Sequence, residues 1–269
     1  MATRYESLGL HQLLPLDRVW VGVRSERAGT FGGFHHPDQG YRHLQMGAVV
    51  TRYGDLSNPA IPSPALVALD LLRAYAHDCL HYGSYREYRI HDGEVVRSQY
   101  GVNPRDAAGR SYSARDPKGS GTTRNLGIIQ EGATDREAAS IARHAAQQVG
   151  LTIPDGTDRF LFLDATGQLG CEALSHLPRN PPEPGTPATA DRFLAAMGSY
   201  ARSVNNRYRA FLAEVGDQDA DELHTLITSA MISGSITSLS AWLDARRGPG
   251  AFAALFRAAT YDGPEPGGA

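Results

Sequence analysis

The segment 64–83, PALVALDLLRAYAHDCLHYG, constrains the fold of this chain more than any other part of its sequence. It follows Ser63 and begins with Pro64, a pair that is typical of a helix N-terminus, and it ends at Gly83. Apolar residues lie on nearly all sides of such a helix, as they do when a helix is enclosed by other elements. We therefore predict a buried helix in the middle of a domain.

The end of this helix carries the pattern H-D-C-L-H. His77 and His81 are four residues apart, so their imidazoles project from one helix face, one turn apart. Two histidines in this arrangement can direct their nitrogens at a single ion about 2.0–2.1 Å away. Asp78 would lie beside that ion, where a carboxylate can accept a proton from a metal-bound water. The pattern therefore predicts a metal site on the helix.

The rest of the first part of the chain mixes strand and helix patterns. The pair Asp92-Gly93 between two strand-like runs predicts a hairpin. A second helix is predicted over 131–150, opening with Q-E-G-A-T-D, so that Glu131 and Asp135 share one face. Further strands are predicted at 19–23, 43–53 and 159–165 and around Ser111–Ser113, with Gly32, Gly33, His35 and His36 in a loop.

A proline-rich segment separates this mixed part from a helical one. Five prolines lie between Leu177 and Thr189, which indicates a linker. Beyond it, helical periodicity recurs over 191–216, 221–232, 238–247 and 251–260. We therefore predict an α/β (α+β) catalytic domain over 1–176, a linker over 177–188, a helical subdomain over 189–260 and a disordered tail over 261–269.

Composition excludes several classes of protein. The net charge is −3, and no segment carries a basic run, so nucleic-acid binding is not expected. No stretch approaches the roughly 18 apolar residues of a membrane span, and the N-terminus lacks the features of a signal peptide, which predicts a cytoplasmic protein with no membrane partner. Two cysteines are too few for a disulfide framework or a thiolate zinc site.

The run H-D-C-L-H, followed by a hairpin and then by Q-E-G-A-T-D, resembles the gluzincin type of zinc metallopeptidase over residues 65–150. That family pairs an H-E-x-x-H helix with a second helix that opens in N-E-G/A-x-S/T-D/E. The resemblance implies a zincin-like domain with a mixed sheet, and Zn²⁺ held by His77, His81 and Glu131. It also implies that Asp135 orients a histidine, His77, and that Asp78 is the general base.

The resemblance predicts a metalloprotease-like hydrolase that cleaves a peptide or amide bond with metal-activated water. The family's base is glutamate, whereas Asp78 is one methylene shorter, and a misplacement of that size can cost on the order of 10²-fold in rate. The family also uses a Tyr or His beyond the second helix to stabilise the oxyanion, and Tyr200, Tyr208 and His224 are the candidates. A strand at 44–52 would bind an extended peptide by edge pairing.

Three other interpretations stay open at this point. H-D-x-x-H also resembles the central motif of HD-domain phosphohydrolases, with His43 as the upstream histidine, although that fold is all-helical. A zincin-shaped protein could instead bind a peptide without turning it over. The histidines could also be structural, hydrogen-bonded on a partly buried helix, with Glu131 and Asp135 as first-turn acids that interact favourably with the helix dipole.

Overall fold

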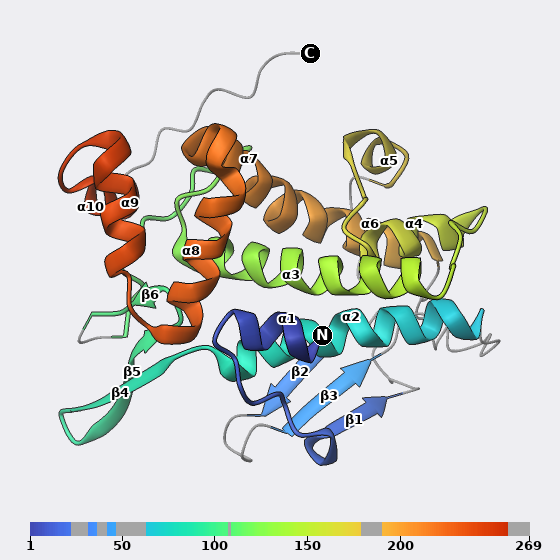
Figure 1. Cartoon of the computed structure of the whole chain (residues 1–269), viewed down its shortest axis with the longest axis horizontal. Coiled ribbons are helices and arrows are strands. Elements are labelled where there is room, and N and C mark those ends of the chain that lie inside the picture. Colours follow the sequence, from blue (N-terminus) through green and yellow to red (C-terminus); the bar gives the residue numbers. More distant parts are fainter. Residues whose placement is uncertain (23–31, 37–41, 47–62, 107–108, 179–189, 258–269) are drawn as a thin grey trace. The chain divides into compact units, whose positions relative to one another are not determined.

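The computed structural model describes residues 1–22, 32–36, 42–46, 63–106, 109–178 and 190–257 (Figure 1). The described chain is mixed α/β, with helices in the majority. Its contacts divide it into two compact units: unit 1 comprises residues 1–12, 83–134 and 203–269, and unit 2 comprises residues 13–82 and 135–202. Both units draw on residues from either side of the proline-rich segment 177–188, of which 179–188 lie outside the described residues, as does the predicted tail 261–269.

Unit 2 contains a small mixed sheet and a group of helices. β1 (Val19–Gly22) follows a short 3₁₀ turn (Leu16–Arg18), and β3 (Arg42–Met46) pairs with β1 in parallel and with β2 (Gly32–His36) in antiparallel. The helices are α2 (Pro64–Gly83, of which Gly83 belongs to unit 1), the second half of α3 (Leu126–Gln148), α4 (Thr157–Ala165), α5 (Cys171–Ser175) and α6 (Ala190–Tyr200).

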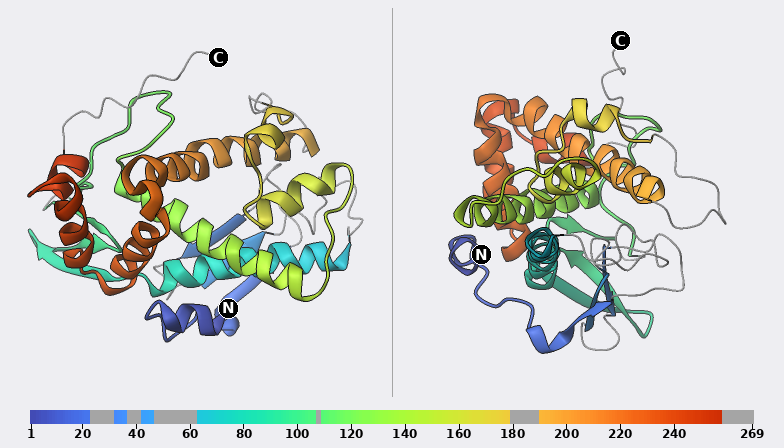
Figure 2. Two further views of the ribbon diagram at one scale, coloured as in Figure 1. Left: turned by 45° about the horizontal axis from the view of Figure 1, so that its top comes forward. Right: turned by 90° about the vertical axis from the view of Figure 1, so that its right-hand side faces the viewer.

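The core of unit 2 joins these helices. α2 contributes Leu66 and Leu69, and the second half of α3 contributes Ala142 and Ala146, so the two helices lie side by side (Figure 2). The remaining core residues come from α4, α5, α6 and their flanks: Leu161, Phe162, Leu163, Ala165, Leu169, Leu174, Leu177, Phe193, Leu194, Met197 and Ala201. Burial of this apolar surface holds the first half of α2 against the second half of α3.

Unit 1 combines α1 (Ala2–Ser7) with an antiparallel sheet in the order β4 (Arg86–His91), β5 (Glu94–Tyr100), β6 (Asn103–Pro104). The first part of α3 also belongs to it. A π-helical segment (Ala201–Asn205) crosses the division between the units and runs into α7 (Asn206–Gly216). A 3₁₀ turn (Asp217–Asp219) then leads to α8 (Ala220–Ser233), α9 (Thr237–Arg247) and α10 (Ala251–Phe256). A second core, including Leu126, Ile129, Tyr208, Phe211 and Met231, holds these helices to α3.

Two predicted elements are confirmed closely. α2 begins at Pro64 and ends at Gly83, as the Ser63-Pro64 pair and the closing glycine predict. The hairpin of β4 and β5 turns at Asp92 and Gly93, which both have positive φ values, 51° and 82°. Two consecutive residues with positive φ are what a two-residue hairpin turn requires, and Asp-Gly tolerates them.

Four predicted elements are wrong, and tertiary context explains them. The run 159–165 lies in α4, a helix, because it has no β-branched residue and buries Leu161, Phe162 and Leu163 in a helical core. The predicted loop with His35 and His36 is β2. The run around Ser111–Ser113 makes a single bridge, Arg105 to Ser111, rather than a strand. α3 begins at Leu126, ahead of the predicted 131.

The predicted peptide-binding edge is also corrected. β3 lies between β1 and β2, so Leu44 pairs with Trp20 on one side and with Phe34 on the other. Residues 44–46 therefore offer no free edge to an extended peptide, and 47–52 lie outside the described residues. Among the described helices, none is long and apolar enough to cross a membrane.

Candidate metal centre

The start of α3 is fixed by side chains that the sequence prediction passed over. The Asn125 side chain accepts hydrogen bonds from the backbone N–H groups of Gly127 (2.9 Å) and Ile128 (3.2 Å), which is the arrangement of a helix N-cap. Just before it, the Asp116 carboxylate accepts bonds from the Thr123 hydroxyl (2.6 Å) and the Arg124 backbone N–H (2.8 Å). These contacts start the helix at Leu126.

Because α3 starts at Leu126, the helix dipole does not explain the two acids Glu131 and Asp135. Glu131 and Asp135 lie five and nine residues beyond Leu126, past the first turn of the helix. A favourable interaction with the helix dipole falls off within the first turn, so it does not account for acids at these positions. Asp135 is 6% exposed, and a carboxylate with so little access to water needs a partner.

The partner of Asp135 is His77. The Nδ1 atom of His77 lies 2.7 Å from Oδ1 of Asp135, within one unit of the fold. With the carboxylate ionised, Nδ1–H donates this bond, and in that tautomer Nε2 is unprotonated, as a metal ligand must be. The structure thus places the Asp135 carboxylate against His77, and the role of Asp135 in orienting that ring stays a prediction.

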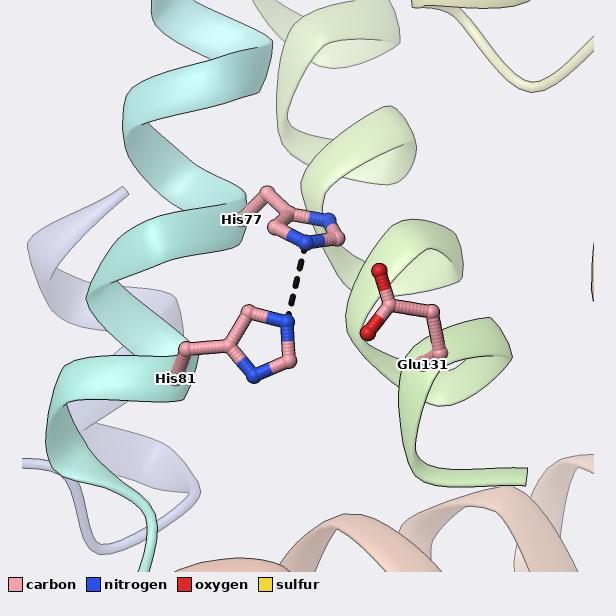
Figure 3. Close-up of side chains that lie close together, drawn as sticks. All are labelled: His77, His81 and Glu131. Carbon is pink, nitrogen blue, oxygen red and sulfur yellow. Dashed lines mark hydrogen bonds between the residues drawn. The ribbon is translucent and has the colours of Figure 1, made fainter. Parts of the chain in front are cut away.

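The two histidines of α2 point their Nε2 atoms at one another. These atoms are 2.9 Å apart, and the rings meet edge to face with centroids 4.6 Å apart. Figure 3 shows both rings directed toward the carboxylate of Glu131, which lies on α3 one turn before Asp135.

Three side chains form a group that could hold a metal ion. Each of His77, His81 and Glu131 offers one ligand atom, and these atoms all lie within 4.8 Å of one another. In a tetrahedral site with metal–ligand distances of about 2.0–2.1 Å, two ligand atoms are about 3.3 Å apart, close to the separation of the two histidine nitrogens. All three are partly exposed, so a water or a substrate atom has access to a fourth position.

Asp78 lies on α2 directly after His77 and is buried, with 7% of its surface exposed. It does not belong to the group of possible ligands found among the described residues. Its neighbour Cys79 is fully buried, and burial raises the pKa of that thiol, so Cys79 is part of the core rather than a nucleophile.

A cluster of charged residues extends from Asp135 away from the histidines. The guanidinium of Arg73, on α2, lies within 4 Å of three carboxylates: Asp70 (3.6 Å), Asp135 (3.9 Å) and Asp164 (3.9 Å). Burial by itself would lower the pKa of Arg73, but these carboxylates and Tyr200 raise it well above its ordinary value. Arg73 is therefore a permanent positive charge beside the carboxylate that binds His77.

Among these carboxylates, Asp164 has a raised pKa. Burial, together with the negative charges of Asp135 and Asp70, raises its pKa from 3.8 to about 6, even though Arg73 acts in the opposite direction. Between these two pH values the folded protein binds more protons at Asp164 than the unfolded chain does, so its contribution to stability is full below about pH 4 and is lost as the pH rises through about 6.

We expect this loss to be measurable in Asp164→Asn. A pKa raised from 3.8 to about 6 corresponds to about 3 kcal/mol. The unfolding free energy of the metal-free wild type, relative to that of Asp164→Asn, should therefore fall by up to this amount between about pH 4 and pH 7. Urea unfolding across this range measures the difference. Asp155→Asn, at an exposed position, is the matched control, and the unfolding free energy of the wild type relative to this variant should not change in the same way with pH. If the wild type and Asp164→Asn have unfolding free energies that follow pH in parallel, the expectation is contradicted.

The three candidates for oxyanion stabilisation lie in two places. In unit 1, the Tyr208 hydroxyl is 2.8 Å from Nδ1 of His224, and both side chains are buried. The Tyr208 side chain packs on Gly132, next to Glu131, so closely that a Cβ at that glycine would lie 2.4 Å from it. In unit 2, Tyr200 ends α6 and interacts electrostatically with Arg73.

Sequence reasoning missed Asp70, Arg73 and Asp164. A signal for the first two was present, because Asp70 and Arg73 precede His77 by seven and four residues and so continue its helix face. Asp164 was hidden by the wrong assignment of 159–165 to a strand. Its place beside Arg73 follows from the packing of α4 on α2, which no local pattern specifies.

No family model matches the chain, and no curated protein or solved structure matches it either.

Proposed function

We propose that this protein is a zinc-dependent hydrolase of gluzincin type, with His77, His81 and Glu131 as the metal ligands. The observation that carries the proposal is the pair of convergent Nε2 atoms on α2 facing a carboxylate of α3, with the Nδ1 of one histidine bonded to Asp135. The two Nε2 atoms lie within hydrogen-bond distance of each other, and together with a carboxylate oxygen of Glu131 they form a group whose atoms all lie within 4.8 Å of one another. The mixed sheet ahead of α2 is compatible with a zincin-like domain.

The proposed chemistry is hydrolysis of a peptide or other amide. A bound zinc ion supplies a Lewis acid that polarises a carbonyl and lowers the pKa of a bound water. Asp135 holds His77 in the tautomer that presents Nε2. Asp78, the neighbour of His77, would take the proton from the water and return it to the leaving amine. Tyr200, or Tyr208 with its partner His224, would donate a hydrogen bond to the oxyanion.

Two observations speak against a phosphohydrolase of the HD type. That fold is all-helical, whereas both units of this chain contain a sheet. The HD motif binds metal through its adjacent His and Asp, but the group of possible ligands among the described residues pairs His77 with His81 and Glu131 instead. His43 lies in β3, and its side chain is outside the part of the chain that the structure describes.

The short side chain of Asp78, the proposed base, favours one further candidate function. Asp78 stands where the family has glutamate, so a zincin-shaped protein that binds peptides and cleaves them slowly or not at all would share this metal centre. Measuring both the binding and the cleavage of the same peptides distinguishes this candidate from the hydrolase.

The test is an assay of zinc-loaded protein against a mixed peptide library, followed by mass spectrometry. We expect new peptide termini that form only in the presence of zinc and disappear with a chelator. Hydrolysis of phosphate monoesters without any peptide cleavage would overturn the proposal in favour of the phosphohydrolase. Zinc-dependent retention of peptides without cleavage would replace it with the binding protein.

A further inference from the structure

The side chain of Arg73 has no function in the proposed reaction, yet it contacts Asp135, the acid that is bonded to His77. It lies on α2 one turn before His77, and its NH1 atom is 3.9 Å from Oδ1 of Asp135, the same oxygen that His77 Nδ1 contacts. One carboxylate oxygen therefore faces both a guanidinium and an imidazole. Any rotation of the Asp135 carboxylate would change both contacts together.

Two more carboxylates hold Arg73 itself. Asp70 approaches NH2 from the preceding turn of α2 at 3.6 Å, and Asp164 approaches the same nitrogen from α4 at 3.9 Å. The guanidinium is planar and rigid, so contacts on NH2 also fix the direction of NH1. Three helices of unit 2, α2, α3 and α4, thus meet at one mostly buried cation.

Part of the Arg73 side chain is costly to bury. Its Nε atom is buried and has no hydrogen-bond partner among the described residues, which costs free energy that an apolar side chain would not cost. Buried ion pairs often stabilise a fold no better than well-packed apolar residues do. A mostly buried arginine that carries this cost, next to the acid that contacts a candidate ligand, points to a role in positioning that acid.

We propose that Arg73 is a positioning residue of the metal centre, which acts through Asp135 to hold His77 with its Nε2 atom toward the metal. This inference rests on the proposed zinc site. The chain of contacts is Arg73 to Asp135 to His77, and each link lies within unit 2. Partners that orient a metal-binding histidine through its second nitrogen are worth about 10- to 100-fold in metal affinity. Arg73 acts one step further out, so its removal is expected to cost about tenfold.

The first readout is the tautomer of His77 in zinc-free protein, measured by long-range ¹H–¹⁵N NMR of the imidazole nitrogens. In the wild type we expect the proton on Nδ1, as the contact with Asp135 requires. In Arg73→Met we expect a mixture with the Nε2–H form, and in Arg73→Lys, which keeps the charge, a return toward the wild-type signal. A wild-type tautomer in a folded Arg73→Met protein would overturn the proposal.

The second readout is the zinc dissociation constant, measured by competition with a chromogenic chelator. Arg73→Met is expected to weaken zinc binding about tenfold and Arg73→Lys less than that. Arg143→Met, which removes an exposed arginine from α3, is the matched control and should not change the affinity. A lower melting temperature with unchanged affinity and tautomer would show that Arg73 is only structural. If the wild type binds no zinc, the proposed function fails, while the tautomer still tests Arg73.

Discussion

Replacing Glu131 with alanine is expected to weaken zinc binding by on the order of 10²-fold or more and to leave the fold intact. Glu131 is one of three protein ligands in the proposed site. A zinc ion held by four protein ligands gains about 10–16 kcal/mol, so one ligand accounts for about 3 kcal/mol, which corresponds to at least two orders of magnitude in Kd. The side chain is partly exposed, so its truncation leaves no large cavity. Competition with a chelator of known affinity measures the change.

Two further variants make this result specific. Glu131→Gln keeps an oxygen ligand but removes the charge, and its affinity should lie between those of Glu131→Ala and the wild type. Glu172→Ala removes an exposed acid from α5 and should bind zinc as the wild type does. Full zinc affinity in Glu131→Ala would remove Glu131 from the ligand set and with it the gluzincin assignment.

The second large effect is expected at Asp78. Asp78→Asn should retain zinc and lose about 10²–10⁴-fold in turnover, because an amide cannot accept the proton of the attacking water. Asp78→Glu should raise turnover by up to about 10²-fold, because the added methylene brings the carboxylate to the distance that the family's glutamate provides. The rate of peptide cleavage at saturating zinc, measured for the three proteins side by side, tests both expectations.

The zinc content of each protein is the control for these rates, since a variant that loses metal reports on binding and not on the base. Unchanged turnover in Asp78→Asn would exclude Asp78 from the mechanism. A wild type that binds peptides without cleaving them, and an Asp78→Glu variant that cleaves them, would identify the natural protein as a zincin-shaped binding protein.

The candidate site was more predictable from the sequence than the fold was. His77 and His81 share a helix face because four residues make one turn, and Glu131 and Asp135 do so for the same reason. Local spacing therefore predicted both pairs of residues, and within unit 2 the structure brings Asp135 against His77. The ends of α2 and the turn of the β4–β5 hairpin also follow from local chemistry, a proline at the helix start and Asp-Gly at the turn.

What local patterns could not predict depends on packing between distant segments. The run around Leu161 reads as a strand by hydrophobicity, yet it forms a helix because it packs against α2 and α6. The start of α3 depends on Asn125, whose side chain caps the helix only once the preceding loop is held by Asp116. The spacing of Asp70 and Arg73 places them on the helix face of His77, but the contacts of Arg73 with Asp135 on α3 and Asp164 on α4 depend on how the helices pack.

Locating the metal in the protein tests the proposed zinc site most directly. Crystals of the zinc-loaded wild-type protein, measured on both sides of the zinc absorption edge, show where zinc lies without reference to any assumed site. One anomalous peak per chain is expected, within about 2.0–2.2 Å of Nε2 of His77, Nε2 of His81 and a carboxylate oxygen of Glu131. A peak at other residues, or none at these three in zinc-loaded crystals, would contradict the assignment of this site as a zinc centre.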